Sequence, residues 1–507
     1  MITSSLEHQF RFQKVFWFGL IVFSALLVGY FLASDLWLLA FGLAGVIWLL
    51  LLPYHSKLSV ILSVATFSSA LIVPLFPGRP YMWEFAALLG WSGLVLTISM
   101  RQASPYTWGI LVKNKWLFIG AIGYCVVLIV TMFYRGVGLR ILGSEQMGGR
   151  YYFQQLTCVV FPFLFLACPP GERTLVRLFI WQCVLTITFL ISDFVFSKAP
   201  EGMFFLLQFF ELTGDAINFE MRAQRFGIRR FQSFYVVGLG MFLLLLVRYK
   251  LNDFIGRRSI WLVPAAAGML GLGVLSGHRY LALIVTGVVV FVCFAQRFLS
   301  AKNVAVAVSL AIGAAVFIYG AADRLPRAAQ RAISFLPGIR IESDAKMDAM
   351  GTLEVRRTLR RIGIEMAPEY FWIGRGFGLA SVDLSWQWDP TTITGHVNQG
   401  RFYNGFVGLL VNTGFFGTVF MLLFLGAGLR VCWIVLKMLR KMGSEDDFLR
   451  LSGVVAALWL ANTIAFLFFH GDSEVAMKTF SLQAGLLLIC REHLERRLKE
   501  FEGQASS

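Results

Sequence analysis

The chain has 507 residues, of which 57% are apolar, 15% aromatic and only 15% charged. Soluble domains carry about 25% charged residues, and the mean hydropathy here is +0.70. This composition excludes a soluble enzyme, a disordered scaffold and a coiled coil. The formal charge is +16, from 45 basic and 29 acidic residues. Membrane topology accounts for most of that excess, and we expect no nucleic-acid partner.

Long apolar runs along the whole chain predict an all-α, polytopic integral membrane protein. A bilayer core of about 30 Å needs roughly 20 apolar residues per helix. By this measure the sequence predicts about 12 to 14 transmembrane helices in the lipid bilayer. The runs lie near residues 15–33, 36–52, 58–75, 81–100, 116–133, 151–168, 174–196, 231–248, 259–275, 280–297, 303–320, 404–429, 451–470 and 475–490.

Basic residues in the short loops predict the orientation of the chain, because such residues are retained in the cytoplasm. With Arg11 and Lys14 inside, the predicted inner loops are basic all along the chain, and the tail after residue 490 is basic too. We therefore expect both termini to be cytoplasmic. The first apolar run lacks a small-residue cleavage site after it, which favours a retained span over a signal peptide.

Three predicted outer segments are too long to be simple turns: 134–150, 197–230 and 321–402. A loop of about 80 residues is usually functional, so the last segment is the first place to look for chemistry. The expected organisation is an N-terminal transmembrane bundle (1–230), a further group of transmembrane helices (231–320), a large outer loop (321–402), and C-terminal helices with a cytoplasmic tail (403–507).

Ionisable residues are almost absent from the predicted membrane centre, since Asp35, Glu84 and Asp193 fall near outer helix ends. An ion-coupled transporter normally needs such groups at mid-membrane, so the pattern counts against one. All seven cysteines lie within predicted spans, and no metal-binding or phosphate-loop motif is present. We expect no cofactor and no metal site.

Arginine dominates the basic residues of the predicted outer segments, with 19 arginines and 3 lysines, against 14 arginines and 9 lysines inside. The planar guanidinium binds phosphate through two parallel hydrogen bonds, which lysine cannot do. This favours a phosphate-bearing ligand at the outer membrane surface. The alternative for each arginine is an ion pair with one of the 19 outer acids.

The outer arginines concentrate in four places. The segment 353–366 would present a basic flank beside apolar residues if helical, as in an amphipathic helix on the outer leaflet, with or without phosphate binding. Arg279, in a polar break between two apolar runs, is a candidate headgroup ligand or an interfacial residue. The four groups are Arg135, Arg140 and Arg150; Arg222, Arg225, Arg229 and Arg230; Arg279; and Arg356, Arg357, Arg360 and Arg361.

Three histidines are predicted to face outside: His278, His396 and His470. A neutral histidine can take a proton from an acceptor hydroxyl, and His396 lies just before an apolar run. His470, followed by Asp472 and Glu474, is expected to cap a short outer turn.

Three motifs follow one another in the C-terminal half. They are Ser276-Gly-His-Arg279 between two spans; Arg356-Arg357-Thr-Leu through Ala367-Pro-Glu-Tyr-Phe-Trp-Ile-Gly-Arg-Gly-Phe-Gly378; and Tyr403-Asn404-Gly-Phe-Val-Gly-Leu-Leu-Val-Asn-Thr-Gly-Phe-Phe-Gly417. In this order they resemble a Ser-x-Arg element, an outer helix with a Pro … Gly-x-Gly turn, and a His-Asn … Gly-x-x-Gly helix start. Over about 261–426, the chain thus resembles the O-antigen ligase and O-antigen (exopolysaccharide) polymerase superfamily of bacterial membrane glycosyltransferases.

The resemblance implies a GT-C-like fold in the bacterial inner membrane, with a large periplasmic loop. It implies an inverting, metal-independent transfer from an undecaprenyl-pyrophosphate-linked glycan to a glycan acceptor. Arginines would hold the pyrophosphate (Arg225, Arg229, Arg279, Arg356 and Arg360), and a periplasmic histidine would act as base. A pyrophosphate leaving group carries its own charge, so fixed cations suffice to stabilise it.

The chain departs from the family where the His-Asn pair becomes Tyr403-Asn404. The candidate catalytic residues are therefore His396, seven residues upstream, and Tyr403, with Asp383 and Asp389 as alternative bases. If the helix at 403 begins early, seven residues make two turns and place His396 and Tyr403 on one face. Gly395 and Gly400 oppose such an early start.

The long outer loop and the displaced histidine favour a polymerase over a ligase that transfers polymer to a lipid A-core acceptor. A lipid-linked oligosaccharide flippase or other exporter is the alternative from another class. A flippase should place its basic residues inside a central cavity and does not need the long loop. A non-catalytic membrane subunit is a third alternative. Candidate protein partners are a chain-length regulator or other envelope-assembly proteins.

Overall fold

A computed structural model of the chain describes residues 23, 26–27, 30, 34, 36–74, 79–100, 105–138, 148–211, 228, 230–378 and 392–506. Over these residues the regular secondary structure is helical, and extended pairing is limited to two isolated bridges, Leu71 with Phe210 and Ile72 with Tyr81. The predicted all-α fold is therefore confirmed. Residues 1–56 and 57–507 form two separate compact units.

In the first unit, α2 (Trp37–Leu50) is a wholly apolar helix followed by the 3-10 turn η1 (Leu52–Tyr54). The helix ends before Pro53, because proline disfavours the helical conformation of the residue that precedes it. The ring of Trp48 contacts that of His55 edge-on, with centroids 4.6 Å apart.

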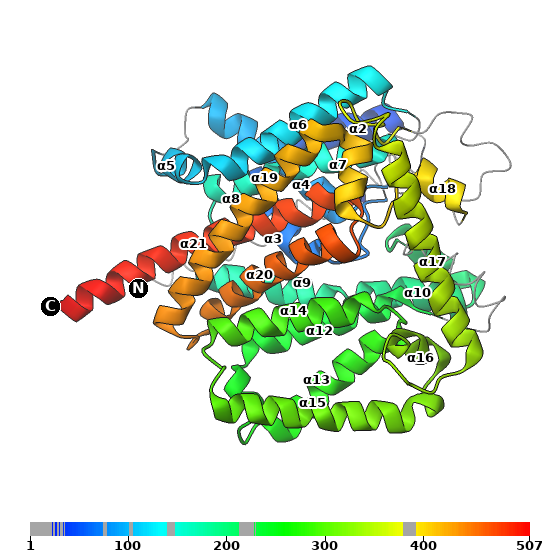
Figure 1. Ribbon diagram of the computed structural model, residues 1–507. Helices are drawn as coiled ribbons and strands as arrows, with labels where there is room; N and C mark the ends of the chain where they lie inside the picture. The colour runs from blue at the N-terminus through cyan, green and yellow to red at the C-terminus, as the bar shows by residue number, and fades with distance from the viewer. Residues whose placement is uncertain are drawn as a thin grey trace. The chain divides into compact units, whose positions relative to one another are not determined.

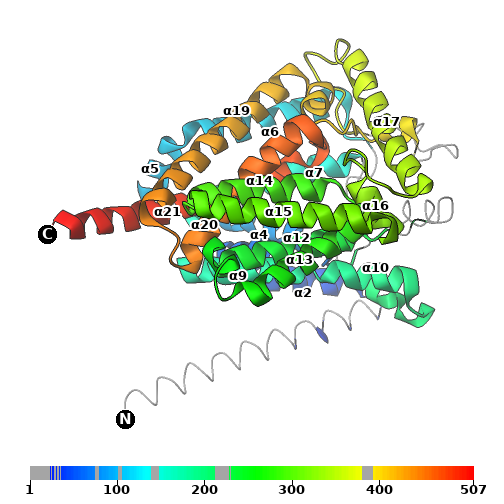
Figure 2. The ribbon, with the colours of Figure 1, turned by 60° about the horizontal axis from the view of Figure 1, so that its bottom comes forward.

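In the second unit, helices of alternating direction pack along one another, with α19 against α6, α20 and α21, and α14 against α20 (Figures 1 and 2). The N-terminal helices are α3 (His55–Thr66), α4 (Met82–Ser99), α5 (Pro105–Lys113), α6 (Lys115–Arg135), α7 (Gly149–Cys158), α8 (Val160–Ala167), α9 (Glu172–Leu185), α10 (Thr188–Lys198) and η2 (Glu201–Gln208). The central ones are α12 (Gln232–Arg248), η3 (Leu251–Phe254), α13 (Ser259–Leu275), α14 (Tyr280–Ala295), α15 (Ala301–Ala321), η4 (Ala322–Arg324), α16 (Arg327–Ile333), α17 (Ser343–Met366) and α18 (Ile393–Asn398). The C-terminal ones are α19 (Gly405–Met442), α20 (Asp447–Ile464), η6 (Ala465–Phe469), η7 (Ser473–Val475) and α21 (Ala476–Ser506).

Six helical segments of the described chain are long and apolar enough to cross a membrane. Three further apolar helices are shorter, with 10 to 17 residues each. The six are Met82–Ser99, Lys115–Arg135, Glu172–Lys198, Ala301–Arg324, Gly405–Met442 and Asp447–Phe469, and the three are Ser233–Arg248, Ser259–Leu275 and Tyr280–Ala295.

The described parts of segment 321–402, expected as one long loop, are largely helical. The predicted helix 353–366 is the second half of α17, which already begins at Ser343. Its buried Leu359 and Gly363 face the start of α19, where a Cβ on Gly363 would touch the side chains of Phe402 and Val407. In Figures 1 and 2, α16 and α17 lie on the side of the bundle opposite the C-terminal part of α21.

The apolar helix expected near residue 403 does not begin early. Its first residue is Gly405, and the side chain of Asn404 caps it by accepting a hydrogen bond from the Val407 N–H at 3.0 Å. His396 belongs instead to the separate helix α18. His396 and Tyr403 therefore do not lie on one face of a single helix.

Candidate functional site

A row of aromatic and histidine rings joins four parts of the chain at one end of the bundle, here called the site end. This is the end where α12, α14, α19 and α21 begin and where α13 and α20 finish. The row contains all three histidines that the sequence places outside. The centroid distances are His278–Tyr235 5.5 Å, Tyr235–Tyr280 6.2 Å, Tyr280–His470 5.4 Å, His470–Tyr403 5.3 Å and Tyr403–His396 5.4 Å.

Tyr403 is the centre of this row. Its ring stacks on His470, with 21° between the planes, and meets His396 edge-on. Its φ of +49° lies in the left-handed region, which costs a non-glycine residue about 1–2 kcal/mol. Such a conformation persists only where the surroundings impose it, and such residues cluster at functional sites.

The loop that carries Tyr403 is fixed on both sides. Gly400, with φ +75°, turns the chain after α18, and the amide of the buried Asn412 donates to its carbonyl at 2.8 Å. The Arg401 N–H donates to the His396 carbonyl at 2.9 Å. His396 and Tyr403 thus meet because the chain reverses between two helices, which side-chain periodicity could not predict.

The Arg401 side chain links this loop to two other elements. Its guanidinium pairs with Glu474 of η7 at 3.1 Å and donates to the hydroxyl of Tyr151, on α7, at 3.0 Å. Glu474 is only 1% exposed, and its burial and the neighbouring Asp472 raise its pKa, an effect that the Arg401 guanidinium opposes.

The glycine-rich turn at 373–378 packs on a kink in α19. Gly414 has φ +70° and ψ −172°, which interrupts the hydrogen bonding of that helix. The Arg375 and Gly376 N–H groups donate to the carbonyls of Val411 and Asn412, at 2.8 and 2.9 Å, and so replace the missing bonds. The Arg375 guanidinium donates to the carbonyls of Val397 and Asn398, which ties α18 to the same turn.

Four arginines gather beside the ring row, around the polar break between α13 and α14. Arg230 donates to the Ser276 carbonyl at 3.2 Å, and Arg331 donates to the Gly277 carbonyl at 2.6 Å. Arg331 also pairs with the buried Asp348, and Arg279 donates to the Arg331 carbonyl at 3.4 Å. Arg356 of α17 lies over the ring of Tyr403, with its guanidinium carbon 5.3 Å from the centroid.

The electrostatics of this group favour an anion. Burial, Arg331 and Arg356 lower the pKa of Arg279 to about 10, and Asp348 only partly opposes them. Burial and the nearby arginines, led by Arg230, hold the pKa of His278 well below its usual range, so it is neutral at physiological pH. Guanidinium groups that converge on Arg279 and lower its pKa indicate a site that an anion would stabilise.

The structure separates the predicted phosphate ligands. Arg279 and Arg356 come together, whereas Arg360 lies one turn further along α17 and is exposed. Arg225 and Arg229 lie outside the described residues, as do Arg140, Arg222, Asp383 and Asp389.

Two other predicted outer arginines have different surroundings. Arg150 is buried and pairs with Glu84 at 2.9 Å. This is the ion pair that the sequence offers as the alternative to phosphate binding, and the guanidinium edge that contacts Glu84 is not open to a phosphate. Arg135 donates to the Gly374 carbonyl at 3.3 Å and lies over the ring of Tyr370. The latter arginine supports the glycine-rich turn.

Sequence reasoning missed Tyr235, Tyr280, Arg331, Arg401 and Glu474. Tyr235 and Tyr280 begin apolar runs, where tyrosine is common at the membrane interface, so they carried no distinct signal. Arg401 lies two residues before Tyr403, and Glu474 four residues after His470. The sequence shows these two spacings, but it does not show that the segment of Arg401 contacts the segment of Glu474.

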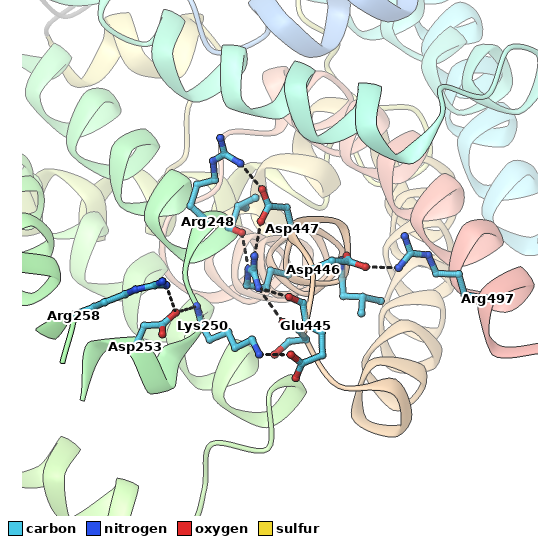
Figure 3. Close-up of polar contacts among 12 residues, drawn as sticks. Arg248, Lys250, Asp253, Arg258, Glu445, Asp446, Asp447 and Arg497 are labelled. Carbon is cyan, nitrogen blue, oxygen red and sulfur yellow. Dashed lines mark hydrogen bonds and ion pairs between the residues drawn. The ribbon is translucent and has the colours of Figure 1, made fainter. Parts of the chain in front are cut away.

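The opposite end of the bundle is held by ion pairs. Figure 3 shows Asp446 and Asp447, at the start of α20, facing Arg497 of α21 and Arg248 of α12. Lys250 pairs with Glu445 in the same view. These basic residues come from loops that the sequence predicts to be inside.

A cavity of about 150 Å³ lies within the bundle among α9, α12, α20 and α21. Its polar lining is neutral, from amide and hydroxyl side chains that include Gln182, Thr186, Asn462 and Gln483. Within the described part of the chain, no three His, Cys, Asp or Glu side chains are grouped so that they could hold a metal ion.

Comparison of the chain with models of known protein families and with curated proteins finds no match.

Proposed function

We propose that the protein is an inverting, metal-independent glycosyltransferase that polymerises O-antigen or exopolysaccharide repeat units carried on undecaprenyl pyrophosphate. The observation that carries the proposal is the placement of Arg279, Arg331 and Arg356 beside the His396–Tyr403–His470 rings. A cationic group and a proton acceptor then lie at one end of an apolar helical bundle. Transfer from a lipid pyrophosphate needs these two groups next to each other.

The arginines bind the pyrophosphate of the donor. Arg279 lies at the start of α14, at the boundary of an apolar helix, where the headgroup of a membrane lipid is found. As the bond between the anomeric carbon and the pyrophosphate breaks, negative charge grows on the leaving oxygen. Guanidinium groups already in place stabilise that charge without further rearrangement. Arg225, Arg229 and Arg360 are proposed as further pyrophosphate ligands, on the sequence prediction alone.

His396 acts as the general base. The acceptor hydroxyl gives its proton to the imidazole, and its oxygen attacks the anomeric carbon from the face opposite the pyrophosphate. The bonding electrons leave with the pyrophosphate, so the configuration inverts. Tyr403 holds the position of His396 by ring contact, and His470 supports Tyr403 from its other face.

The neutral cavity favours a transferase over a flippase. A flippase for a pyrophosphate lipid should carry its basic residues in a central cavity, whereas the residues that line the cavity among α9, α12, α20 and α21 are uncharged. Arg230, Arg279, Arg331 and Arg356 lie instead at the site end. A ligase that transfers finished polymer to a lipid A-core acceptor uses the same chemistry and stays the alternative within the class.

We further propose a GT-C-like membrane protein with 12 to 14 spans, both termini in the cytoplasm and the site end at the periplasmic face. Two observations support this orientation. The segments predicted to be outside meet at the site end, as in the contacts of Arg401 with Tyr151 and Glu474. Basic loops predicted to be inside meet at the opposite end (Figure 3).

The test is the lipid content of a deletion strain. A polymerase defect leaves single repeat units on undecaprenyl pyrophosphate at the periplasmic leaflet, and a ligase defect leaves long polymer on the same lipid. Repeat units trapped on the cytoplasmic leaflet would show a flippase and overturn the proposal. An unchanged lipid profile would overturn any role in this pathway.

Complementation of the deletion with arginine variants tests the site itself. We expect Arg279→Ala and Arg356→Ala each to lower the rate of polymer formation by about 100-fold or more, as loss of a transition-state charge contact does. Arg361→Ala is the matched control on α17, because Arg361 is 73% exposed and pairs only loosely with Glu365, at 3.8 Å. Equal polymer from all three variants at equal protein level would contradict the proposed arginine role.

A further inference from the structure

An ion pair between Arg401 and the buried Glu474 joins the loop between α18 and α19 to η7. Arg401 lies between His396 and Tyr403 in sequence, and Glu474 lies four residues after His470. Their contact at 3.1 Å therefore joins the two segments that supply the contacting rings of His396, Tyr403 and His470. The Tyr151 hydroxyl accepts a second hydrogen bond from Arg401 and adds α7 to the junction.

We propose that Arg401 and Glu474 are positioning residues that hold His396 and Tyr403 in register with His470. The inference rests on the proposed function for the identity of the reaction, but not for the geometry. The left-handed backbone of Tyr403 needs a constraint close by, and Arg401 supplies it two residues away through its backbone and its side chain.

We expect the Arg401–Glu474 pair to affect the ring contacts of Tyr403 more than the overall stability of the bundle. Phe402 points instead into a small apolar cluster with Val407 and Val411, which anchors the start of α19 without Arg401. Replacement of Glu474 frees the guanidinium while this cluster remains. The loop can then shift, and the His396–Tyr403 and Tyr403–His470 ring contacts are the first to change.

The need to fix the orientation of this loop also explains why Arg401 and Glu474 are charged. A guanidinium reaches a carboxylate and a phenol in fixed directions at the same time, which a pair of apolar side chains cannot do. Apolar replacement of a buried ion pair often preserves stability. An apolar double variant is thus expected to fold but to lose the orientation of the loop.

The experiment uses the full-length protein in lipid nanodiscs with an undecaprenyl-pyrophosphate-linked repeat unit as substrate. We expect Glu474→Gln and Arg401→Lys to lower kcat by about 10- to 100-fold, as misplacement of a catalytic group does. KM for the lipid should change less than about twofold, because the arginines that bind pyrophosphate are untouched.

The apolar double variant Arg401→Met/Glu474→Leu separates positioning from stability. It should unfold near the wild-type temperature yet stay as slow as the single variants. Recovery of wild-type kcat in the double variant would show that the pair is merely structural. The matched control is Arg497→Lys and Glu172→Gln, an ion pair of the same type at the opposite end, which should leave kcat unchanged.

A second readout does not depend on turnover. The rate at which diethyl pyrocarbonate modifies His396 and His470, measured by mass spectrometry, should rise several-fold in Glu474→Gln and stay unchanged in Glu172→Gln. An unchanged modification rate overturns the positioning role, even if the protein proves to be a glycosyltransferase. A raised rate in a protein without transferase activity supports the positioning role and refutes the proposed function.

Discussion

The neighbours of Tyr403 determine what its side chain contributes to the site. Its ring contacts two histidines, His396 edge-on and His470 by stacking. An aromatic side chain offers two faces and an edge, so it can order two partners at once. The ring of Tyr403 therefore brings two imidazole groups into one place.

The identity of the base can be tested one residue at a time. We expect His396→Ala to lower turnover by about 100- to 10,000-fold, as loss of a general base does. Added imidazole should restore part of that loss, because it can occupy the vacated space and accept the proton. Tyr403→Phe keeps the ring and should cost less than about tenfold.

His470→Ala is the comparison for this test. It removes a stacked neighbour of Tyr403 and should lower turnover without rescue by imidazole. Rescue of His470→Ala and none for His396→Ala would reverse the two roles. Full activity in both histidine variants would place the base elsewhere, in the part of the loop that contains Asp383 and Asp389.

The surroundings of each arginine likewise determine whether it can bind an anion. Arg150 and Arg356 belong to groups that looked alike in the sequence, but Arg150 is buried against Glu84 and Arg356 lies over Tyr403 beside other cations. Residue type could propose both as phosphate ligands. Only the neighbouring charges distinguish an arginine that is already neutralised from one that favours an anion.

At the scale of elements, the kink in α19 shapes the site. The backbone at Gly414 breaks the helix, and the turn at 371–378 supplies donors to the carbonyls that the break leaves open. Since Arg375 of that turn also holds the end of α18, the kink is connected to the loop between α18 and α19.

Gly414→Ala tests this connection. A Cβ at residue 414 would lie 2.7 Å from the Trp372 carbonyl oxygen and 2.9 Å from the Gly374 nitrogen, in a backbone conformation with φ +70°. We expect it to destabilise the protein by about 1–2 kcal/mol or more and to lower activity. Thermal unfolding in detergent measures the first effect and polymer formation the second.

Gly426→Ala is the control in the same helix. Nothing lies within 4 Å of a Cβ there, so the change should be neutral or stabilise the helix by up to about 1 kcal/mol. Equal unfolding temperatures for the two variants would mean that the turn at 371–378 does not depend on the kink.

At the scale of the whole second unit, the two ends differ in chemistry. The site end has a row of rings with converging arginines, whereas the other end has basic residues paired with acids such as Asp446 and Asp447 (Figure 3). Arg279 and Arg356 at the site end thus keep a capacity for an external anion, and the basic residues opposite are largely neutralised within the protein.

The orientation of these ends can be measured with two matched cysteine substitutions. Lys346 on α17 and Lys441 on α19 are both exposed lysines, at the site end and the opposite end respectively. In intact cells without an outer-membrane barrier, a membrane-impermeant maleimide should label Lys346→Cys and leave Lys441→Cys unlabelled until the cells are opened. The wild-type protein sets the background from its seven cysteines, and the reverse labelling pattern would invert the topology.

Much of the fold followed from local chemistry. Apolar runs predicted helices, Gly277 and its polar neighbours predicted the break before Tyr280, and the i, i+4 arginines predicted the second half of α17. The start of α17 at Ser343 could not be predicted in the same way, because its first turns are held by Arg331 and Asp348, a contact between two helices. The same limit applied to α18, whose position depends on Arg375.

The sequence by itself determined the helical class, the apolar character of the bundle and the sign of charge in its loops, because these depend on composition and on near-neighbour periodicity. It also singled out His396, Tyr403, Arg279 and Arg356 as residue types suited to the chemistry. Only the tertiary structure decided that Arg356 and His396 both contact Tyr403, that Arg150 pairs with Glu84 instead, and that Arg401 contacts Glu474. Such decisions depend on contacts between segments tens to hundreds of residues apart, and those contacts leave no periodic trace in the chain.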